Sequence, residues 1–418
     1  MDWNEFIKKI QDLFMQYSYT MGLKCSDESL EFRLGDYDIK YTKEEFNFIR
    51  ERAEKIEYKS FTIKGKRTYE ALLYEPNDNI SSFSDFEKIG FLQTLDDSLS
   101  YEVSEVSDFM LYHILKNMNS SKYILAYHFD IFEHYNLSSG RFLSVLKKFM
   151  ILPYSIKLRY KNEVSEDKLI SIIKSFLFDI SVNYNSVFRL ASDEEEVLGK
   201  GAMYHRSNKT TPINAASNKI YMSAILDQYS LAMANEDPMM QFIAYYHVLE
   251  YFFKTIRTEK AKKSINEVEG LKELSEENAE IKSEIISKLS TDFKKFLHLR
   301  EDDSLLLILE IYIDIDELKE RLEFISASSI DYYKSNEVTF SKGSKVDLLS
   351  SNEELIYKNL KNRIYKTRNS IVHNKLNEDN EDENLIYNPF EDEEELKKEI
   401  PLMRAIAEQV IINTAEEI

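Results

Sequence analysis

Residues that interrupt regular secondary structure are scarce in this chain. Its 418 residues include nine glycines and six prolines, and these two residue types are the strongest local breakers of helices and strands. An architecture of many short strands needs frequent turns, whereas long helices need few. The sequence therefore predicts a mainly α protein. Because 418 residues exceed what one hydrophobic core usually organises, we expect two domains or more.

The N-terminal part departs from the helical pattern at several places. Residues 58–63 and 69–74 alternate apolar and polar side chains around Lys64-Gly65-Lys66, which is typical of a β-hairpin. Residues 156–160 alternate in the same way. Helical periodicity is present over residues 109–117, 140–149 and 166–180. We therefore expect residues 1–197 to form a mixed α+β domain that precedes a helical one.

The C-terminal half is helical in pattern. Residues 198–218 contain glycines, a proline and several small polar residues, which predicts a linker before a domain at 219–418. The apolar pattern predicts helices over 220–234, 239–256, 304–325 and 354–372. Asp237-Pro238 provides a cap and a first-turn proline for the second of these helices. We interpret residues 260–350 as a helical insertion in this domain.

Composition excludes several classes of protein. The single cysteine, Cys25, rules out an intrachain disulfide and a zinc site built on several thiolates of this chain, and it fits a cytoplasmic location. No apolar run approaches the roughly 20 residues that span a bilayer, so we expect no membrane insertion. The net charge of −20 argues against a protein that coats nucleic acid non-specifically. We expect neither a metal nor a cofactor.

Charge is distributed unevenly near the C-terminus. Residues 358–375 carry six positive charges and no acid, whereas residues 378–395 carry ten acids and no base. The basic segment predicts a local phosphate-binding surface on an otherwise acidic chain, formed by Lys361, Arg363, Lys366 and Lys375. The acidic run is either a solvated loop or an anionic gate that competes with RNA for the basic segment.

Arg368, Asn369 and His373 lie within the basic segment. Arg368 is expected at the edge of the apolar stripe of its helix. A guanidinium there is partly withdrawn from water yet can still bind a phosphate. Asn369 and His373 are four residues apart, so the amide can orient the imidazole. Arg368 and His373 lie about 140° apart around a regular helix. Either the helix loosens between them, or the two residues meet across the two-fold axis of a dimer; this geometry favours the composite dimeric site.

These residue types suit RNA cleavage through the 2′-hydroxyl. A histidine transfers protons near neutral pH, and an arginine stabilises the charge that develops on the phosphate. Such a site needs no metal, and the products carry a 2′,3′-cyclic phosphate and a 5′-hydroxyl. Glu250 follows several aromatic residues and could position Arg368, or it could be a partly exposed structural residue. In a purely structural alternative, Arg368 pairs with a nearby acid and His373 caps or packs a helix end.

The segment Arg368-Asn369-Ser370-Ile371-Val372-His373 resembles the Arg-polar-x-x-x-His signature of HEPN domains, which are helical ribonucleases. The aromatic helix around residues 241–252, with Glu250, is similar to one in the ApeA-like HEPN group. The resemblance covers about residues 220–418. It implies a homodimeric, metal-independent endoribonuclease that attacks RNA, often tRNA, as a toxin or in anti-phage defence. It also implies an N-terminal domain that senses a phage-derived or regulatory protein trigger.

Three functional hypotheses follow from the sequence. The first is a restrained HEPN ribonuclease that uses Arg368, Asn369 and His373. The second is a non-catalytic HEPN-like module that dimerises, or binds a nucleotide or RNA, and acts as a regulator. A scaffold without any nucleic-acid role is a third reading. The intact Arg-Asn-x-x-x-His set favours the enzyme, because a protein that had lost catalysis would tolerate its loss.

Overall fold

The computed structural model divides the chain into two compact units, Met1–Lys219 and Ile220–Glu417, which are described separately below. The protein is mainly helical. The residues described are 1–14, 23–34, 37–74, 79–81, 91–93, 98–118, 142–149, 154–184, 187–191, 203–205, 219–259, 299–372 and 386–417. Of the expected linker at 198–218, the described part is residues 203–205, which form a short strand.

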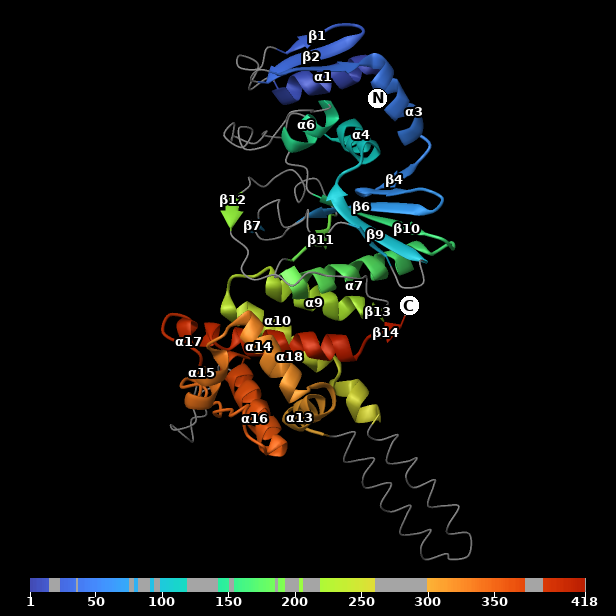
Figure 1. Ribbon diagram of the computed structural model, residues 1–418. Coiled ribbons are helices and arrows are strands. Elements are labelled where there is room, and N and C mark those ends of the chain that lie inside the picture. The colour runs from blue at the N-terminus through green and yellow to red at the C-terminus, as the bar shows by residue number, and fades with distance from the viewer. Residues whose placement is uncertain are drawn as a thin grey trace, which may run out of the picture. The chain divides into compact units, whose positions relative to one another are not determined.

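The first unit combines helices with antiparallel sheets (Figure 1). Its helices are α1 (Trp3–Phe14), α3 (Lys43–Ala53), α4 (Asp108–Asn117), α6 (Phe142–Phe149) and α7 (Glu166–Tyr184). Its strands are β1 (Lys24–Cys25), β2 (Ser29–Leu34), β3 (Tyr37–Thr42), β4 (Glu57–Lys59), β5 (Thr62–Lys64), β6 (Thr68–Tyr74), β7 (Asn79–Ser81), β8 (Phe91–Gln93), β9 (Leu99–Glu105), β10 (Tyr154–Tyr160), β11 (Arg189–Leu190) and β12 (Met203–His205).

The largest sheet of this unit follows the order β4-β5-β6-β10-β9-β8, and β11 also pairs with β6. Its centre is β10, where Ile156 lies opposite Ala71 of β6 and Val103 of β9. Helix α7 packs on one face, where Phe176 stacks on Tyr101 of β9 with ring centroids 4.5 Å apart. The strands β1, β2 and β3 form a separate sheet, and β7 pairs with β12 in parallel.

The expected hairpin at residues 58–74 is a three-stranded meander. The segment predicted as one strand at 58–63 is folded back on itself as β4 and β5, which pair antiparallel. The turn between them contains Ser60 and Phe61, whose φ angles are 45° and 59°. Left-handed backbone at two successive residues usually requires glycine or asparagine. The turn was not predicted because Ser60 and Phe61 carry no such signal.

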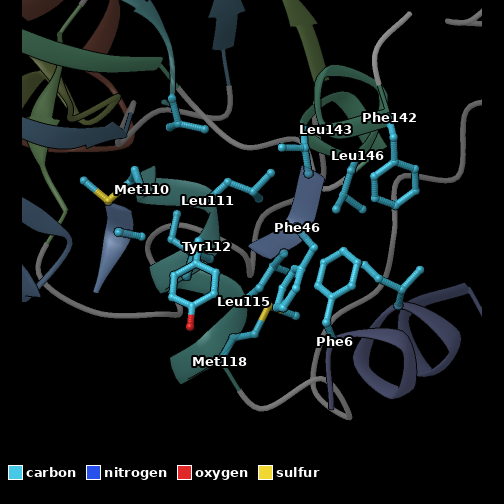
Figure 2. Packing of buried hydrophobic residues seen from close by; sticks show 14 of the residues in the cluster. Phe6, Phe46, Met110, Leu111, Tyr112, Leu115, Met118, Phe142, Leu143 and Leu146 are labelled. Atoms are coloured by element: carbon cyan, nitrogen blue, oxygen red, sulfur yellow. The ribbon is translucent and has the colours of Figure 1, made fainter. Parts of the chain in front are cut away.

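A hydrophobic core on the side of α1, α3, α4 and α6 stabilises the first unit. Figure 2 shows Phe6 of α1, Phe46 of α3 and Phe142 of α6 beside several apolar side chains of α4. Phe6 and Phe46 are almost fully buried, with ring centroids 4.9 Å apart. Helix α3 begins at a capping box, in which Thr42 accepts from the backbone N–H of Glu45 and the Glu45 carboxylate accepts from the backbone N–H of Thr42.

The second unit is a helical bundle (Figure 1). Its helices are α9 (Ser223–Met233), α10 (Pro238–Tyr251), α13 (Glu301–Tyr312), α14 (Ile315–Ile325), α15 (Ser329–Ser335), α16 (Glu353–Val372), α17 (Glu393–Lys397) and α18 (Ile400–Asn413). Two short strands, β13 (Lys219–Ile220) and β14 (Glu416–Glu417), pair with each other. Of the insertion expected at 260–350, residues 260–298 lie outside the described part of the chain.

Two expected helices are interrupted. The helix predicted over 239–256 is α10, which begins at the expected Asp237 cap and has a turn at Phe252 before helical residues 253–259. The helix predicted over 304–325 is two helices, α13 and α14. The break occurs because the Asp314 side chain accepts from the backbone N–H groups of Asp316 and Glu317, which begins a new helix.

Apolar packing and buried charged side chains, among them those around Glu408, hold the bundle together. Glu408 of α18 is almost fully buried and accepts from Tyr229 Oη of α9 at 2.6 Å and from Arg404 Nε at 2.8 Å. Arg321 of α14 also donates to both of its carboxylate oxygens. Burial opposes the charge of Glu408, but Arg404 and Arg321 hold its pKa below the usual value. The cluster therefore ties three helices together around a charged carboxylate.

Among the described residues, no helix combines the length and the apolar composition that crossing a membrane requires.

Candidate functional site

Helix α16 carries the predicted site. Ile356, Leu360 and Ile364 are buried along one side, at the spacing of a helix with one apolar face. This stripe fixes the rotation of the helix within the bundle. As a result, Arg368 lies at the edge of the buried face, with 14% of its side chain exposed.

Helix α13 runs antiparallel to α16 and supplies acids to it. Arg368 Nη2 lies 3.2 Å from Glu301 Oε1. Two turns earlier on α16, Lys361 Nζ lies 3.3 Å from Asp302 Oδ2. Nearer the start of α16, the Tyr357 hydroxyl donates to the Ile313 carbonyl at 2.9 Å. Residues later in α16 therefore contact residues earlier in α13, as two antiparallel helices do. The first turn of α13 therefore faces the last turns of α16.

Three helices meet at Arg368. The hydroxyl of Tyr246, from α10, donates to Glu301 Oε1 at 2.7 Å, so this oxygen interacts with both Tyr246 and Arg368. The guanidinium carbon of Arg368 also lies 5.3 Å from the ring centroid of Tyr246, within the range of a cation–π contact. Arg368 Nη1 donates to Asn369 Oδ1 at 3.2 Å. The guanidinium is thus held from α10, α13 and α16.

Tyr246 is a rigid support for this arrangement because its side chain is 1% exposed. Burial raises its pKa far above the ordinary value, and the hydrogen bond to Glu301 and the charge of Glu301 raise it further. The phenol therefore stays protonated and remains a hydrogen-bond donor to Glu301. The role expected for Glu250, to position Arg368, belongs in this structure to Glu301 and Tyr246.

Glu250 lies elsewhere on α10. Its side chain is 44% exposed, and its Oε2 lies 4.0 Å from Nε2 of His247, which is also largely exposed. The two residues are on the solvent side of α10, because the buried side chains of this helix include Val248 and Leu249. Glu250 is therefore a partly exposed residue, as in the second of the two interpretations of the sequence.

The expectation that Arg363 binds RNA is wrong. Arg363 has no exposed surface, and its Nε and Nη2 donate to the two carboxylate oxygens of Glu399 at 2.6 and 2.8 Å. Its Nη1 donates to the carbonyls of Asn336 and Ser344 at 2.8 and 2.9 Å. Position 363 is three residues after Leu360, so it falls on the buried side of α16. Arg363 is a structural core residue.

The other basic residues differ in their surroundings. Lys361 is mostly buried against Asp302, so it has a carboxylate partner within the protein. Lys366 is exposed and donates to the carbonyl of Lys342 at 3.1 Å. Lys358 is exposed and pairs with Glu354. Acids from α13, from α16 itself and from position 399 therefore neutralise much of the charge that appears uncompensated in the sequence. Of the three lysines, Lys366 is the best placed to contact a phosphate.

His373 and Lys375 lie outside the described residues, as does the first part of the acidic run, residues 378–385. The described helix ends at Val372, directly before His373. The chain returns at residues 386–387, where the backbone N–H of Tyr387 donates to the Ser370 carbonyl at 3.0 Å. This contact ties the returning chain to the end of α16, beside the expected site.

In the described part of the chain, no three histidine, cysteine, aspartate or glutamate side chains come together as a metal site requires. Arg368 and Lys366 are cations, and the acids beside Arg368 are engaged in ion pairs and hydrogen bonds. Guanidinium and ammonium groups such as these are the side-chain groups that bind phosphates in proteins.

The helical unit matches a known protein family. Residues 225–412 are similar to the family described as methylamine utilization protein MauJ. The match includes nearly all of the helical unit and the whole of α16, but slightly less than half of the chain. Neither the curated proteins nor the solved structures gave a match.

Proposed function

We propose that this protein is a metal-independent endoribonuclease whose helical unit is a HEPN-like bundle and whose catalytic residues are Arg368, Asn369 and His373. Arg368 stabilises the charge that develops on the scissile phosphate, His373 transfers a proton, and Asn369 orients His373. The observation that supports this proposal most strongly is the fixation of Arg368 by Glu301 and Tyr246. This arrangement gives the arginine one orientation near the end of α16, five residues before His373 in the sequence.

The active protein is, in this proposal, a cytoplasmic homodimer that acts as a toxin or an anti-phage effector on RNA such as tRNA. Arg368 of one protomer and His373 of the other form each site, because the two residues lie about 140° apart on a regular helix. The unit Met1–Lys219 then receives a phage-derived or regulatory protein signal. Lys366 and Lys375 contribute to RNA binding.

Two observations favour other candidate functions. The pairing of Arg368 with Glu301 also fits a non-catalytic HEPN-like regulator, in which the arginine is structural or binds a nucleotide without reaction. The match of residues 225–412 to a family described by methylamine utilization favours a role in that process. Deleting the gene and measuring growth on methylamine tests the second of these candidates.

The direct test is an RNA cleavage assay in EDTA with purified wild-type protein and the variants Arg368→Ala and His373→Ala. The proposal predicts cleavage by the wild type and a loss of about 100-fold or more in each variant, because one residue stabilises the transition state and the other transfers a proton. Lys358→Ala is the matched control: it removes a positive charge from the same helix at an exposed position paired with Glu354. It is expected to cleave like the wild type.

Circular dichroism establishes that each variant is folded. Full activity of folded His373→Ala protein in EDTA would exclude the assigned site. Expression in growing bacteria gives a parallel readout, in which the wild type arrests growth and degrades RNA whereas His373→Ala does neither. Growth arrest of equal strength by both proteins would show that any toxicity has another origin.

A further inference from the structure

Glu301 has an unusual environment for a carboxylate at the start of a helix. Its Oε1 accepts from the Tyr246 hydroxyl at 2.7 Å and lies 3.2 Å from Arg368 Nη2. Its Oε2 accepts no hydrogen bond from a described residue, and 29% of the side chain is exposed. One oxygen of this carboxylate is therefore anchored, and the other is open to a ligand beside Arg368.

The proposed reaction requires two proton transfers. The 2′-hydroxyl must lose a proton as its oxygen attacks phosphorus, and the 5′-oxygen must gain one as its bond to phosphorus breaks. One histidine cannot perform both at the same moment, so a second group must accept the first proton. Of the described side chains that contact Arg368, Glu301 is the one that carries a negative charge and has a free oxygen.

We propose that Glu301 is the general base of this site, an inference that rests on the ribonuclease function proposed above. Glu301 Oε2 takes the proton of the 2′-hydroxyl as the 2′-oxygen forms its bond to phosphorus. The bond from phosphorus to the 5′-oxygen breaks, and protonated His373 donates a proton to that oxygen. The products are a 2′,3′-cyclic phosphate and a 5′-hydroxyl, and exchange with water restores both groups.

The surroundings of Glu301 fit this role. Its negative charge lies in the first turn of α13, where the helix dipole stabilises an anion. The buried Tyr246 hydroxyl holds Oε1 in place through its hydrogen bond. Because the two oxygens belong to one planar carboxylate, the orientation of Oε2 is restricted as well. Arg368 draws the phosphodiester to the same place, so that the phosphate and the proton acceptor are brought together.

Glu301→Gln is the sharpest variant because the amide oxygen can still accept from Tyr246 and Arg368 but cannot take a proton. The inference predicts that kcat falls about 100-fold or more while KM changes less than about threefold. The rising limb of the pH–rate profile, which reports ionisation of the base, is expected to disappear. Asp303→Asn is the matched control, since it removes another acid from the same helical turn, and it should leave kcat and the pH profile unchanged.

Glu301→Ala separates catalysis from support of Arg368. Added formate should restore part of its activity, because a small carboxylate can occupy the vacated position and accept the proton. Wild-type kcat in Glu301→Gln would overturn the inference. So would an inactive Glu301→Ala that formate fails to restore, combined with a wild-type pH profile for Glu301→Gln. In each of these cases, loss of cleavage in His373→Ala still supports the ribonuclease function, whereas full activity of His373→Ala refutes that function independently of Glu301.

Discussion

Arg363 and Glu399 form a two-pronged ion pair in which the arginine is fully buried and the glutamate is 2% exposed. The pair joins α16 to the start of α18, and carbonyl groups of residues 336 and 344 bind the same guanidinium. Removing one partner of such a pair leaves the other charge buried without compensation. Arg363 therefore stabilises the fold, although it lies only five positions from the proposed catalytic residue Arg368.

Arg363→Ala is therefore expected to lower the free energy of unfolding by about 3–5 kcal/mol. Urea unfolding followed by circular dichroism at the helical wavelength measures the loss. The double variant Arg363→Met, Glu399→Leu removes both charges. It should lose clearly less free energy of unfolding than the single variants Arg363→Met and Glu399→Leu lose together. Strict additivity would show that the two side chains do not depend on each other.

A second prediction concerns pH and His113 in the first unit. Burial lowers the pKa of His113 below 6.5, although its hydrogen bond to the Ala53 carbonyl opposes this effect. The unfolded chain then binds more protons than the folded chain below that pH. The contribution of neutral His113 to the free energy of unfolding is therefore present above about pH 6.5 and is lost as the pH falls below it.

Fluorescence of Trp3, the single tryptophan of the chain, reports unfolding of the same core. The wild type should lose stability between about pH 7 and pH 5, whereas His113→Gln, which does not titrate, should show a flatter dependence. Equal slopes for the two proteins would remove His113 as the cause.

The third prediction concerns the turn at Ser60 and Phe61, where both φ angles are positive. Ser60→Asn should raise the free energy of unfolding by about 0.5–1 kcal/mol, because asparagine tolerates this conformation better than serine does. Phe61→Gly relieves the same backbone strain but removes a buried ring, so it should destabilise. Thermal unfolding of both variants is the measurement, and destabilisation by Ser60→Asn would contradict the explanation.

The fourth prediction concerns the composite site. Arg368→Ala and His373→Ala are each expected to be inactive, but co-expression should restore about one quarter of wild-type activity, since half of the dimers are mixed and one of their two sites is intact. Absence of any restored activity in verified mixed dimers would place both residues of a site on one chain.

The sequence predicts the local parts of the site better than its surroundings. Helix α16 lies at 353–372 against an expected 354–372, because its apolar stripe and length are local signals. The same stripe includes positions 363 and 367, both fully buried, so the burial of Arg363 was also readable from its spacing. Its partner Glu399 was not, because nothing local connects residues 36 positions apart.

Glu301 illustrates the same limit. It is one of three consecutive acids in the first turn of α13, which by themselves indicate only a favourable charge at a helix N-terminus. Its contact with Arg368 depends on the antiparallel packing of α13 and α16, and helix packing is a tertiary property. By contrast, the break between α13 and α14 had a local signal in Asp314, a strong N-cap residue.

The most direct test of the central claim uses two RNA oligonucleotides in EDTA that differ only by a 2′-deoxy substitution at the cleaved nucleotide. Wild-type protein, activated if necessary, is expected to cleave the unmodified RNA to a 2′,3′-cyclic phosphate and to leave the substituted RNA intact. His373→Ala should cleave neither. Cleavage of the 2′-deoxy RNA by the wild type, or of the unmodified RNA by folded His373→Ala protein, would contradict the account.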